Sequence, residues 1–192
     1  MISSPKFSIC EIDCGRSALI GLAACPGKPE VAPHLPVGYL LRDLQSDLET
    51  VQAWGAEAVV TLLLDEEIAE LGVLEIGASV RRLGMSWLHL PINDGSAPTP
   101  EWDQEWVEAK KRIHCALDRG RRVLLHCEAG RGRSGTVAAR ILMERGMHAG
   151  IAIDTVRARR AGAINEPRQA DYLFALTPNF PSFPLIKMVA PG

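Results

Sequence analysis

The sequence predicts a single α/β domain with a central, mostly parallel, twisted sheet flanked by helices. Two stretches, 58–64 (AVVTLLL) and 122–126 (RVLLH), are short and rich in aliphatic residues, which is typical of parallel strands buried on both faces. Between them, apolar residues at three- and four-residue steps indicate amphipathic helices. Strands that alternate with helices favour a parallel sheet with helices on its faces. The 192 residues suit one domain, and 47% hydrophobic with 23% charged residues argue against a disordered or fibrous chain.

The first part of the chain should hold two strands and one helix. Apolar and polar residues alternate over 7–12, as in an edge strand, and 18–23 is a short apolar run that a Cys-Pro-Gly turn closes. Three prolines predict an irregular loop over 29–36. The stretch 42–54 carries apolar residues at helical spacing, and Gly55 should end that helix.

The middle of the chain should alternate strand and helix. After the strand at 58–64, Asp65-Glu66-Glu67 look like an N-cap followed by an acidic first helical turn. We expect a further helix over 74–83 and a strand over 86–90. The clearest helix is 101–119, in which apolar residues recur every three or four positions.

The last part of the chain begins with the strand at 122–126, which leads through a glycine-rich stretch into a helix over 136–145. Two more helices are expected over 150–160 and 167–176. The tail 177–192 contains four prolines and should pack without regular structure.

Charge and cysteine content limit the classes of function. A net charge of −2 argues against a broad basic surface for nucleic acid or for a membrane. The five cysteines form no C-x-x-C pair, the start carries no signal-like apolar run, and no stretch is long enough to span a bilayer. These features predict a cytoplasmic protein with reduced thiols and no transmembrane segment.

The loop 126–135, His-Cys-Glu-Ala-Gly-Arg-Gly-Arg-Ser-Gly, carries the chemistry. Such a loop between a buried strand and a helix can turn successive backbone N–H groups inward and bind an anion. Cys127 opens the loop, where the N–H groups and the helix dipole should favour its thiolate. The planar guanidinium of Arg133 can close over these N–H groups and bind two phosphate oxygens. Ser134 can stabilise the sulfur as a leaving group, and His126 is expected to fix the loop through backbone hydrogen bonds.

A thiolate below a phosphate and a guanidinium beside it predict nucleophilic attack on phosphorus without a metal or cofactor. The residues expected to bind the phosphate are Glu128, Ala129, Gly130, Arg131, Gly132 and Arg133.

His-Cys-x5-Arg-Ser resembles the signature of the protein tyrosine phosphatase superfamily, in its cysteine-dependent dual-specificity branch. Arg42-Asp43-Leu44 with Asp47-Leu48, and Cys25-Pro26-Gly27-Lys28, are similar to the kinase-associated phosphatase subgroup. The resemblance covers roughly residues 18–176. It implies one phosphatase domain over 1–192 that hydrolyses phosphotyrosine, with phosphoserine and phosphothreonine as further options, on a protein or peptide partner.

The same resemblance implies two residues outside the loop. Members of the family need a general acid on a separate loop, and Asp94 in Pro-Ile-Asn-Asp-Gly fits it at the end of a predicted strand. Asp94 would protonate the leaving group and then deprotonate the hydrolytic water. Gln169 matches the glutamine with which relatives position that water.

Other interpretations stay open. The spacing Gly130-x-Gly132-x-x-Gly135 also fits a dinucleotide-binding loop, for which Asp154 would contact a ribose. Cys127 could be a plain core thiol, and Asp94 a turn cap. Among phosphatases, a phosphoinositide or small phosphate ester is an alternative substrate, and an inactive phosphoprotein-binding module is an alternative of another class.

Several side chains have two interpretations each. Glu128 is expected at the loop rim, where it would discourage a very highly charged substrate. Arg131 is either a solvated charge or a contact to a second anionic group. Trp102 and Trp106 are expected mainly in the core. A basic cluster, Arg157, Arg159 and Arg160, is either a solvated helix face or a patch that attracts phosphorylated partners.

Overall fold

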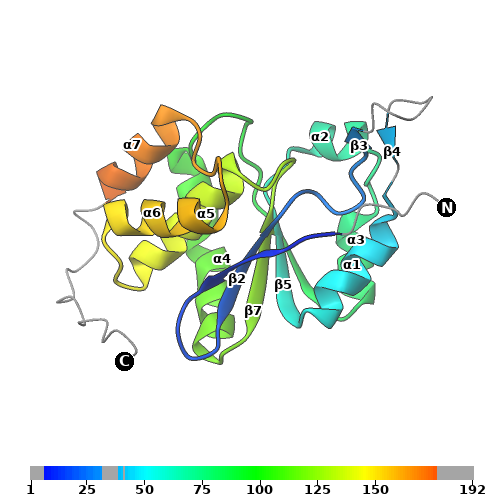
Figure 1. Cartoon of the computed structure of the whole chain (residues 1–192), viewed down its shortest axis with the longest axis horizontal. Coiled ribbons are helices and arrows are strands. Elements are labelled where there is room, and N and C mark those ends of the chain that lie inside the picture. The colour runs from blue at the N-terminus through cyan, green and yellow to red at the C-terminus, as the bar shows by residue number, and fades with distance from the viewer. Residues whose placement is uncertain (1–6, 32–38, 41, 177–192) are drawn as a thin grey trace.

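A five-stranded sheet forms the centre of the molecule (Figure 1). The computed structural model describes residues 7–31, 39–40 and 42–176. The spatial order is β1-β2-β7-β5-β6; β1 pairs antiparallel with β2, and the other pairs are parallel. The strands are β1 Cys10–Asp13, β2 Leu19–Ala23, β5 Ala56–Thr61, β6 Ser86–His89 and β7 Arg122–His126. A separate antiparallel pair is formed by β3 Glu30–Val31 and β4 Tyr39–Leu40.

Helices cover both faces of the sheet. In Figure 1, α1–α3 lie on the right of the sheet and α4–α7 on its left. The helices are α1 Leu44–Ala53, α2 Asp65–Glu70, α3 Ile76–Arg82, α4 Pro100–Asp118, α5 Gly132–Glu144, α6 Ala149–Arg159 and α7 Pro167–Leu176. No helix of the described part is long and apolar enough to cross a membrane. The predicted class, a single α/β domain with a mostly parallel sheet, is confirmed.

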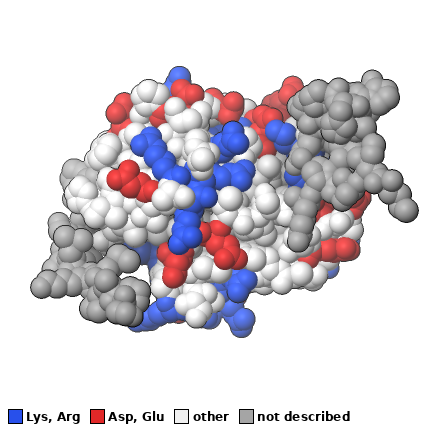
Figure 2. Space-filling view, viewed as in Figure 1, with Lys and Arg blue, Asp and Glu red and all other residues white. Residues whose placement is uncertain are grey.

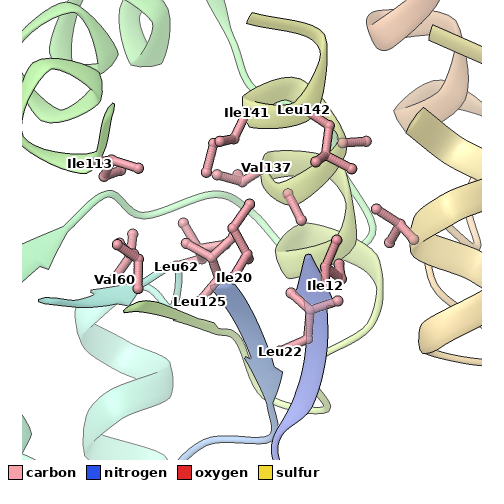
Figure 3. Close-up of a cluster of buried hydrophobic side chains, with 14 of the residues drawn as sticks. Ile12, Ile20, Leu22, Val60, Leu62, Ile113, Leu125, Val137, Ile141 and Leu142 are labelled. Carbon is pink, nitrogen blue, oxygen red and sulfur yellow. The ribbon is translucent and has the colours of Figure 1, made fainter. Parts of the chain in front are cut away.

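The core has two halves because the central strands are buried on both faces. Along β7, Val123 and Leu125 point into the half beneath α4–α7, whereas Leu124 points into the half beneath α1–α3. In β5, Val60 and Val59 divide in the same way. Figure 3 shows the larger half, where side chains from the sheet meet those of α4 and α5. This two-sided burial explains the uninterrupted apolar runs in the sequence.

Local signals explain where α1 and α4 begin. The carboxylate of Asp43 accepts a hydrogen bond from the N–H of Ser46 (2.7 Å), which caps α1. At α4, the hydroxyl of Thr99 caps the helix and Pro100 is its first residue. The cap expected at Asp65 is wrong, because Leu64 takes that position and its N–H donates to the carboxylate of Glu67 (2.8 Å).

The largest difference between expectation and structure concerns α5. The predicted helix begins at Thr136, but α5 begins at Gly132, inside the glycine-rich loop. Glycines lower the intrinsic helix propensity of this stretch, and the tertiary structure winds it into the first turn regardless. The irregular loop expected over 29–36 contains the short strand β3, and its remainder, 32–36, lies outside the described residues. The tail 177–192 also lies outside them.

The parallel direction of four strands brings their following loops to one edge of the sheet. The segments after β2, β5, β6 and β7 are the Cys25–Lys28 turn, the start of α2, the Asp94 loop and the glycine-rich loop. Ligands of open α/β sheets bind outside the carboxyl ends of the strands. This edge is therefore where the site is expected.

A buried polar chain lies at the same end of the sheet. His126, the last residue of β7, is fully buried, and its Nε2 lies 2.7 Å from the hydroxyl of Thr61 on β5. That hydroxyl also accepts a hydrogen bond from Nε1 of Trp87 (2.8 Å). Burial lowers the pKa of His126 to about 4, so the imidazole is neutral in the folded protein near pH 7.

The buried His126 should make stability depend on pH. As pH falls below about 6.5, the imidazole becomes protonated in the unfolded state, whereas in the folded state it stays neutral until pH approaches 4. The contribution of the neutral imidazole to stability is therefore complete above about pH 6.5 and is lost between about pH 6.5 and pH 4. Between pH 7 and pH 4, the free energy of unfolding of the wild type should fall by about 3 kcal/mol more than that of His126→Gln. Urea unfolding at several pH values measures this difference.

His148→Gln is the matched control, because His148 is exposed and the variant should follow the wild type. Parallel curves for the wild type and His126→Gln would contradict the prediction.

Candidate active site

The loop between β7 and α5 needs glycine for its path. Cys127 directly follows β7 and is almost fully buried. Gly130 has φ +66°, and a Cβ atom on it would lie 2.1 Å from the carbonyl oxygen of Ala23 on β2. Gly132 lies close to the segment at the start of α7, since a Cβ there would lie 2.6 Å from Oδ1 of Asn165 and 3.0 Å from Nε2 of Gln169. Side chains at either position would push the loop away from its neighbours.

Three successive carbonyl groups of this loop point outward, each to a donor from outside the loop. The carbonyl of Glu128 accepts from the N–H of Cys25 (3.1 Å). Those of Ala129 and Gly130 accept from Nη2 (2.7 Å) and Nε (3.1 Å) of Arg160. In a trans peptide the C=O and the following N–H point in opposite directions. The N–H groups of Ala129, Gly130 and Arg131 therefore turn away from these donors, and no described residue accepts from them.

Ala129 and Arg131 line a pocket of about 390 Å³, which brings together most of the predicted site residues, although Gly130, His126 and Ser134 are not part of its lining. Its lining is Asp94, Gly95, Cys127, Glu128, Ala129, Arg131, Gly132, Arg133, Gly162, Asn165, Glu166 and Gln169. Residues from the loop after β7, from the start of α5, from α7 and from the loop after β6 thus meet in one cavity. No group of side chains suited to hold a metal ion occurs among the described residues.

Arg133 is buried beside the pocket and bound on several sides. Its Nη1 and Nη2 donate to the two carboxylate oxygens of Glu67 (2.7 and 2.8 Å), and Nη1 also donates to the carbonyl of Ile92 (3.1 Å). Burial lowers the pKa of Arg133, but the hydrogen bonds that it donates to Glu67, together with the neighbouring Cys127 and the carboxylates of Glu67 and Asp94, outweigh burial and raise the pKa above the ordinary arginine value. Nε is buried without a partner among the described residues.

Glu67 is a site residue that the sequence analysis missed. It was expected only as part of an acidic first turn, yet it forms a two-bond ion pair with Arg133 from 66 positions away. The one available signal was its place directly after a buried strand, at the edge of the sheet where the loops converge.

Asp94 and Gln169 approach the pocket from two other elements. Oδ1 of Asp94 lies 3.0 Å from Nη2 of Arg133, and its side chain is 77% exposed, which leaves it room to move. Gln169 is fully buried at the start of α7. Its Nε2 donates to the carbonyl of Ser96 (3.2 Å), and its Oε1 accepts from the N–H of Glu166 (3.4 Å), so it anchors the Asp94 loop.

Ser134, on the first turn of α5, and His126, directly before Cys127, differ in their surroundings. The hydroxyl of Ser134 is buried with no hydrogen-bond partner among the described residues. The Nε2 of His126 contacts the Thr61 hydroxyl on the neighbouring strand. Hydrogen bonding between His126 and the backbone of Cys127 raises the pKa of the imidazole against the larger effect of burial, which agrees with the expected contact to the loop backbone.

Both positively and negatively charged side chains lie at the rim of the pocket. Nζ of Lys28, in the turn after β2, lies 2.6 Å from Oε1 of Glu128. The negative charge of Glu128 is therefore compensated, which weakens the expected repulsion of highly charged substrates. Arg131 is exposed beside Gly162. On the face shown in Figure 2, Lys and Arg gather near the middle with carboxylates close to them, and no uniformly basic surface forms.

The three arginines of the basic cluster at the end of α6 differ in their contacts. Arg157 donates to the carbonyls of Ala163 and Ile164, and Arg160 to the glycine-rich loop, whereas Arg159 is exposed. A purely solvated face is therefore the wrong interpretation for Arg160, whereas Arg157 is exposed like Arg159 although it makes these two bonds.

Trp102 and Trp106 are core residues, as expected. Their rings stack at 5.1 Å, and both side chains are buried. Nε1 of Trp102 donates to the carbonyl of Leu90 (3.1 Å), which fixes α4 to the segment before Asp94.

Comparisons with known proteins agree with this arrangement. Residues 40–147 match the family described as "Polymorphic toxin system, DSP-PTPase phosphatase". Bovine protein tyrosine phosphatase type IVA 3 is 33% identical over 130 residues, 68% of this chain and 69% of the relative. Rat cyclin-dependent kinase inhibitor 3 is 30% identical over 160 residues, 82% of this chain and 71% of the relative.

Solved structures share the fold. The chain superimposes on kinase associated phosphatase with a TM-score of 0.78, 24% identity and coverage of 92% of this chain and 97% of that chain. Tk-PTP in a G95A mutant form gives 0.65, 28% identity and coverage of 88% and 95%. The family match extends over more than half of the chain and includes the Cys127 loop. The chain therefore belongs to the dual-specificity branch of the protein tyrosine phosphatase superfamily and is a phosphomonoester hydrolase of that family.

Proposed function

We propose that this phosphatase hydrolyses phosphotyrosine on proteins through a cysteinyl-phosphate intermediate formed on Cys127. The observation that carries the proposal is one pocket in which a buried thiol, inward N–H groups and a buried guanidinium with a free Nε meet. The inward N–H groups and the charge of Arg133 favour a thiolate and a bound phosphate in the same place.

In the first step, the sulfur of Cys127 attacks phosphorus and the bond from phosphorus to the tyrosyl oxygen breaks. The loop N–H groups and Arg133 stabilise the equatorial phosphate oxygens, and they are already oriented when the substrate arrives. Asp94 donates a proton to the departing phenoxide. Ser134, whose hydroxyl has no described partner, is suited to donate to the sulfur.

In the second step, water attacks phosphorus and the bond to sulfur breaks, which releases inorganic phosphate and restores the thiolate. Asp94, now ionised, accepts the proton of the water. Gln169 lines the pocket and anchors the Asp94 loop through Ser96. We assign it the positioning of this loop together with that of the water.

The contact between Asp94 and Arg133 suggests how the acid reaches the leaving group. Nε and Nη2 form one side of the guanidinium fork, and a phosphate that binds there with two oxygens needs both. Nε is free, but Nη2 contacts Oδ1 of Asp94 (3.0 Å). Substrate binding would therefore displace the Asp94 carboxylate from Arg133 and leave it free to turn toward the leaving oxygen.

A phosphoprotein substrate is supported by the rim of the pocket and by the relatives. Arg131 is the single basic rim residue within the loop without a carboxylate partner, and Glu128 is paired with Lys28. This rim offers little extra attraction for a multiply charged phosphoinositide. The relatives include proteins named protein tyrosine phosphatases. We also propose a reducing, cytoplasmic setting, because all five cysteines are free thiols and Cys127 must remain one.

Replacing the nucleophile tests the mechanism. Cys127→Ser should reduce hydrolysis of p-nitrophenyl phosphate by about 10³-fold or more, because the hydroxyl is not ionised at neutral pH, and should leave phosphate binding in place. Steady-state rates and phosphate titration by calorimetry measure the two effects. Cys115→Ser, an exposed thiol on α4, is the control and should keep the wild-type rate. Turnover by Cys127→Ser, or loss of wild-type activity in EDTA, would contradict a metal-independent cysteine mechanism.

Asp94→Asn tests the general acid. The rate on phosphotyrosine peptide should fall about 10²-fold, since the amide cannot protonate the phenoxide. The fall should be much smaller for 2,4-dinitrophenyl phosphate, whose leaving group needs no proton. Asn93→Ala is the neighbouring control. An equal loss on both substrates would remove Asp94 from the acid role.

Substrate class is tested by rates measured side by side on one enzyme preparation. We expect the phosphotyrosine peptide to have the highest kcat/KM, above a phosphothreonine peptide of the same sequence and above a phosphatidylinositol phosphate in mixed micelles. A higher value for the lipid would replace the phosphoprotein assignment, and no hydrolysis of any of them would support a binding module.

A further inference from the structure

Arg160 contacts the glycine-rich loop from outside the pocket, through bonds that can hold the loop in its shape. It follows the last residue of α6 and is half-buried. Nη2 donates to the carbonyl of Ala129 (2.7 Å), Nε to that of Gly130 (3.1 Å), and Nη1 lies 3.3 Å from Sγ of Cys10 on β1. One guanidinium thus links α6, the edge strand and two successive peptide groups of the loop, although Arg160 does not line the pocket.

The two carbonyl bonds determine which way the loop amides face. The peptide groups that follow Ala129 and Gly130 have their oxygens held toward α6, so their N–H groups, which belong to Gly130 and Arg131, point the opposite way. Gly130 imposes little conformational restriction, since glycine moves readily between positive and negative φ. The orientation of these two amides therefore depends on the outside donors more than on the loop itself.

The positive charge of Arg160, like its geometry, favours anion binding by these amides. A guanidinium bound to the carbonyl ends of two peptide groups increases their polarisation, which makes the opposite N–H ends better donors to an anion. Lysine could not reproduce this arrangement, because a single ammonium lacks the planar fork that reaches both oxygens.

We propose that Arg160 is a positioning residue that holds the amides of Gly130 and Arg131 toward the substrate phosphate and the sulfur of Cys127. The proposal rests on the proposed function, because it concerns the same pocket. It gives Arg160 a role in phosphate binding without direct contact with the substrate.

The test compares Arg160→Gln with Arg159→Gln. Both remove one positive charge from neighbouring positions, but Arg159 is exposed and makes no bond to the loop. Three quantities are measured on each full-length variant: the inhibition constant of orthovanadate, kcat/KM for p-nitrophenyl phosphate, and the rate at which iodoacetate alkylates Cys127 at neutral pH. A thermal unfolding curve shows whether each variant is folded.

Arg160→Gln should weaken vanadate inhibition and lower kcat/KM by about tenfold each, and should slow alkylation of Cys127, because two charge-assisted hydrogen bonds are lost. Arg159→Gln should stay within about twofold of the wild type. Arg160→Lys should remain impaired, because it keeps the charge but loses the fork.

Two results would overturn the inference. A folded Arg160→Gln with wild-type vanadate inhibition and alkylation rate would show that Arg160 does not position the amides. Full activity of Arg160→Lys would show that charge alone is needed. Either outcome leaves the proposed function intact, whereas a wild-type protein without Cys127-dependent hydrolysis would remove the proposed function itself. If Arg160→Gln does not fold, the same measurements on Arg160→Lys decide whether Arg160 positions the amides.

Discussion

The buried charge of Arg133 is the constraint on which the arrangement of this site depends. A guanidinium with almost no exposure requires partners, and two segments provide three of them: Glu67 in α2 after β5, and the carbonyl of Ile92 with the carboxylate of Asp94 after β6. Removal of one partner from a buried ion pair typically costs about 3–5 kcal/mol. The segments after β5 and β6 are thereby fixed to the helix that carries Arg133. The same contacts orient the guanidinium so that Nε remains available for a ligand.

A second constraint is the backbone polarity of the glycine-rich loop. Its carbonyls need donors outside the loop if its N–H groups are to face an anion. Cys25 on one side and Arg160 on the other provide those donors, from the turn after β2 and the end of α6. The loop is therefore held between two distant segments of the chain. In the proposed function the oriented N–H dipoles of the loop bind the phosphate together with Arg133, so a net charge of −2 does not oppose binding of a dianion.

Much of the fold and part of the site could be predicted because the signals are local. Strand β7 has the predicted bounds, as does α7, since apolar periodicity and flanking Gly or Pro define them. Cys127, Arg133, Asp94 and Gln169 were predicted and line one pocket. Glu67 and Arg160 were not recognised, because an acidic first turn and a basic helix end are common on solvated surfaces. The early start of α5 was also missed, because its glycines oppose a helix locally.

The sequence by itself determined the order of elements, the two-sided burial of the central strands and the residues of the signature loop, because each depends on neighbouring residues and on hydrophobic periodicity. Only the tertiary structure decided which charges meet. Arg133 pairs with a carboxylate 66 positions away, Lys28 with one 100 positions away, and the carbonyls of Ala129 and Gly130 bind a guanidinium about 30 positions away. The physical reason is that parallel strands gather distant loops at one edge of the sheet, and a linear pattern does not record which of their polar groups come within hydrogen-bond distance.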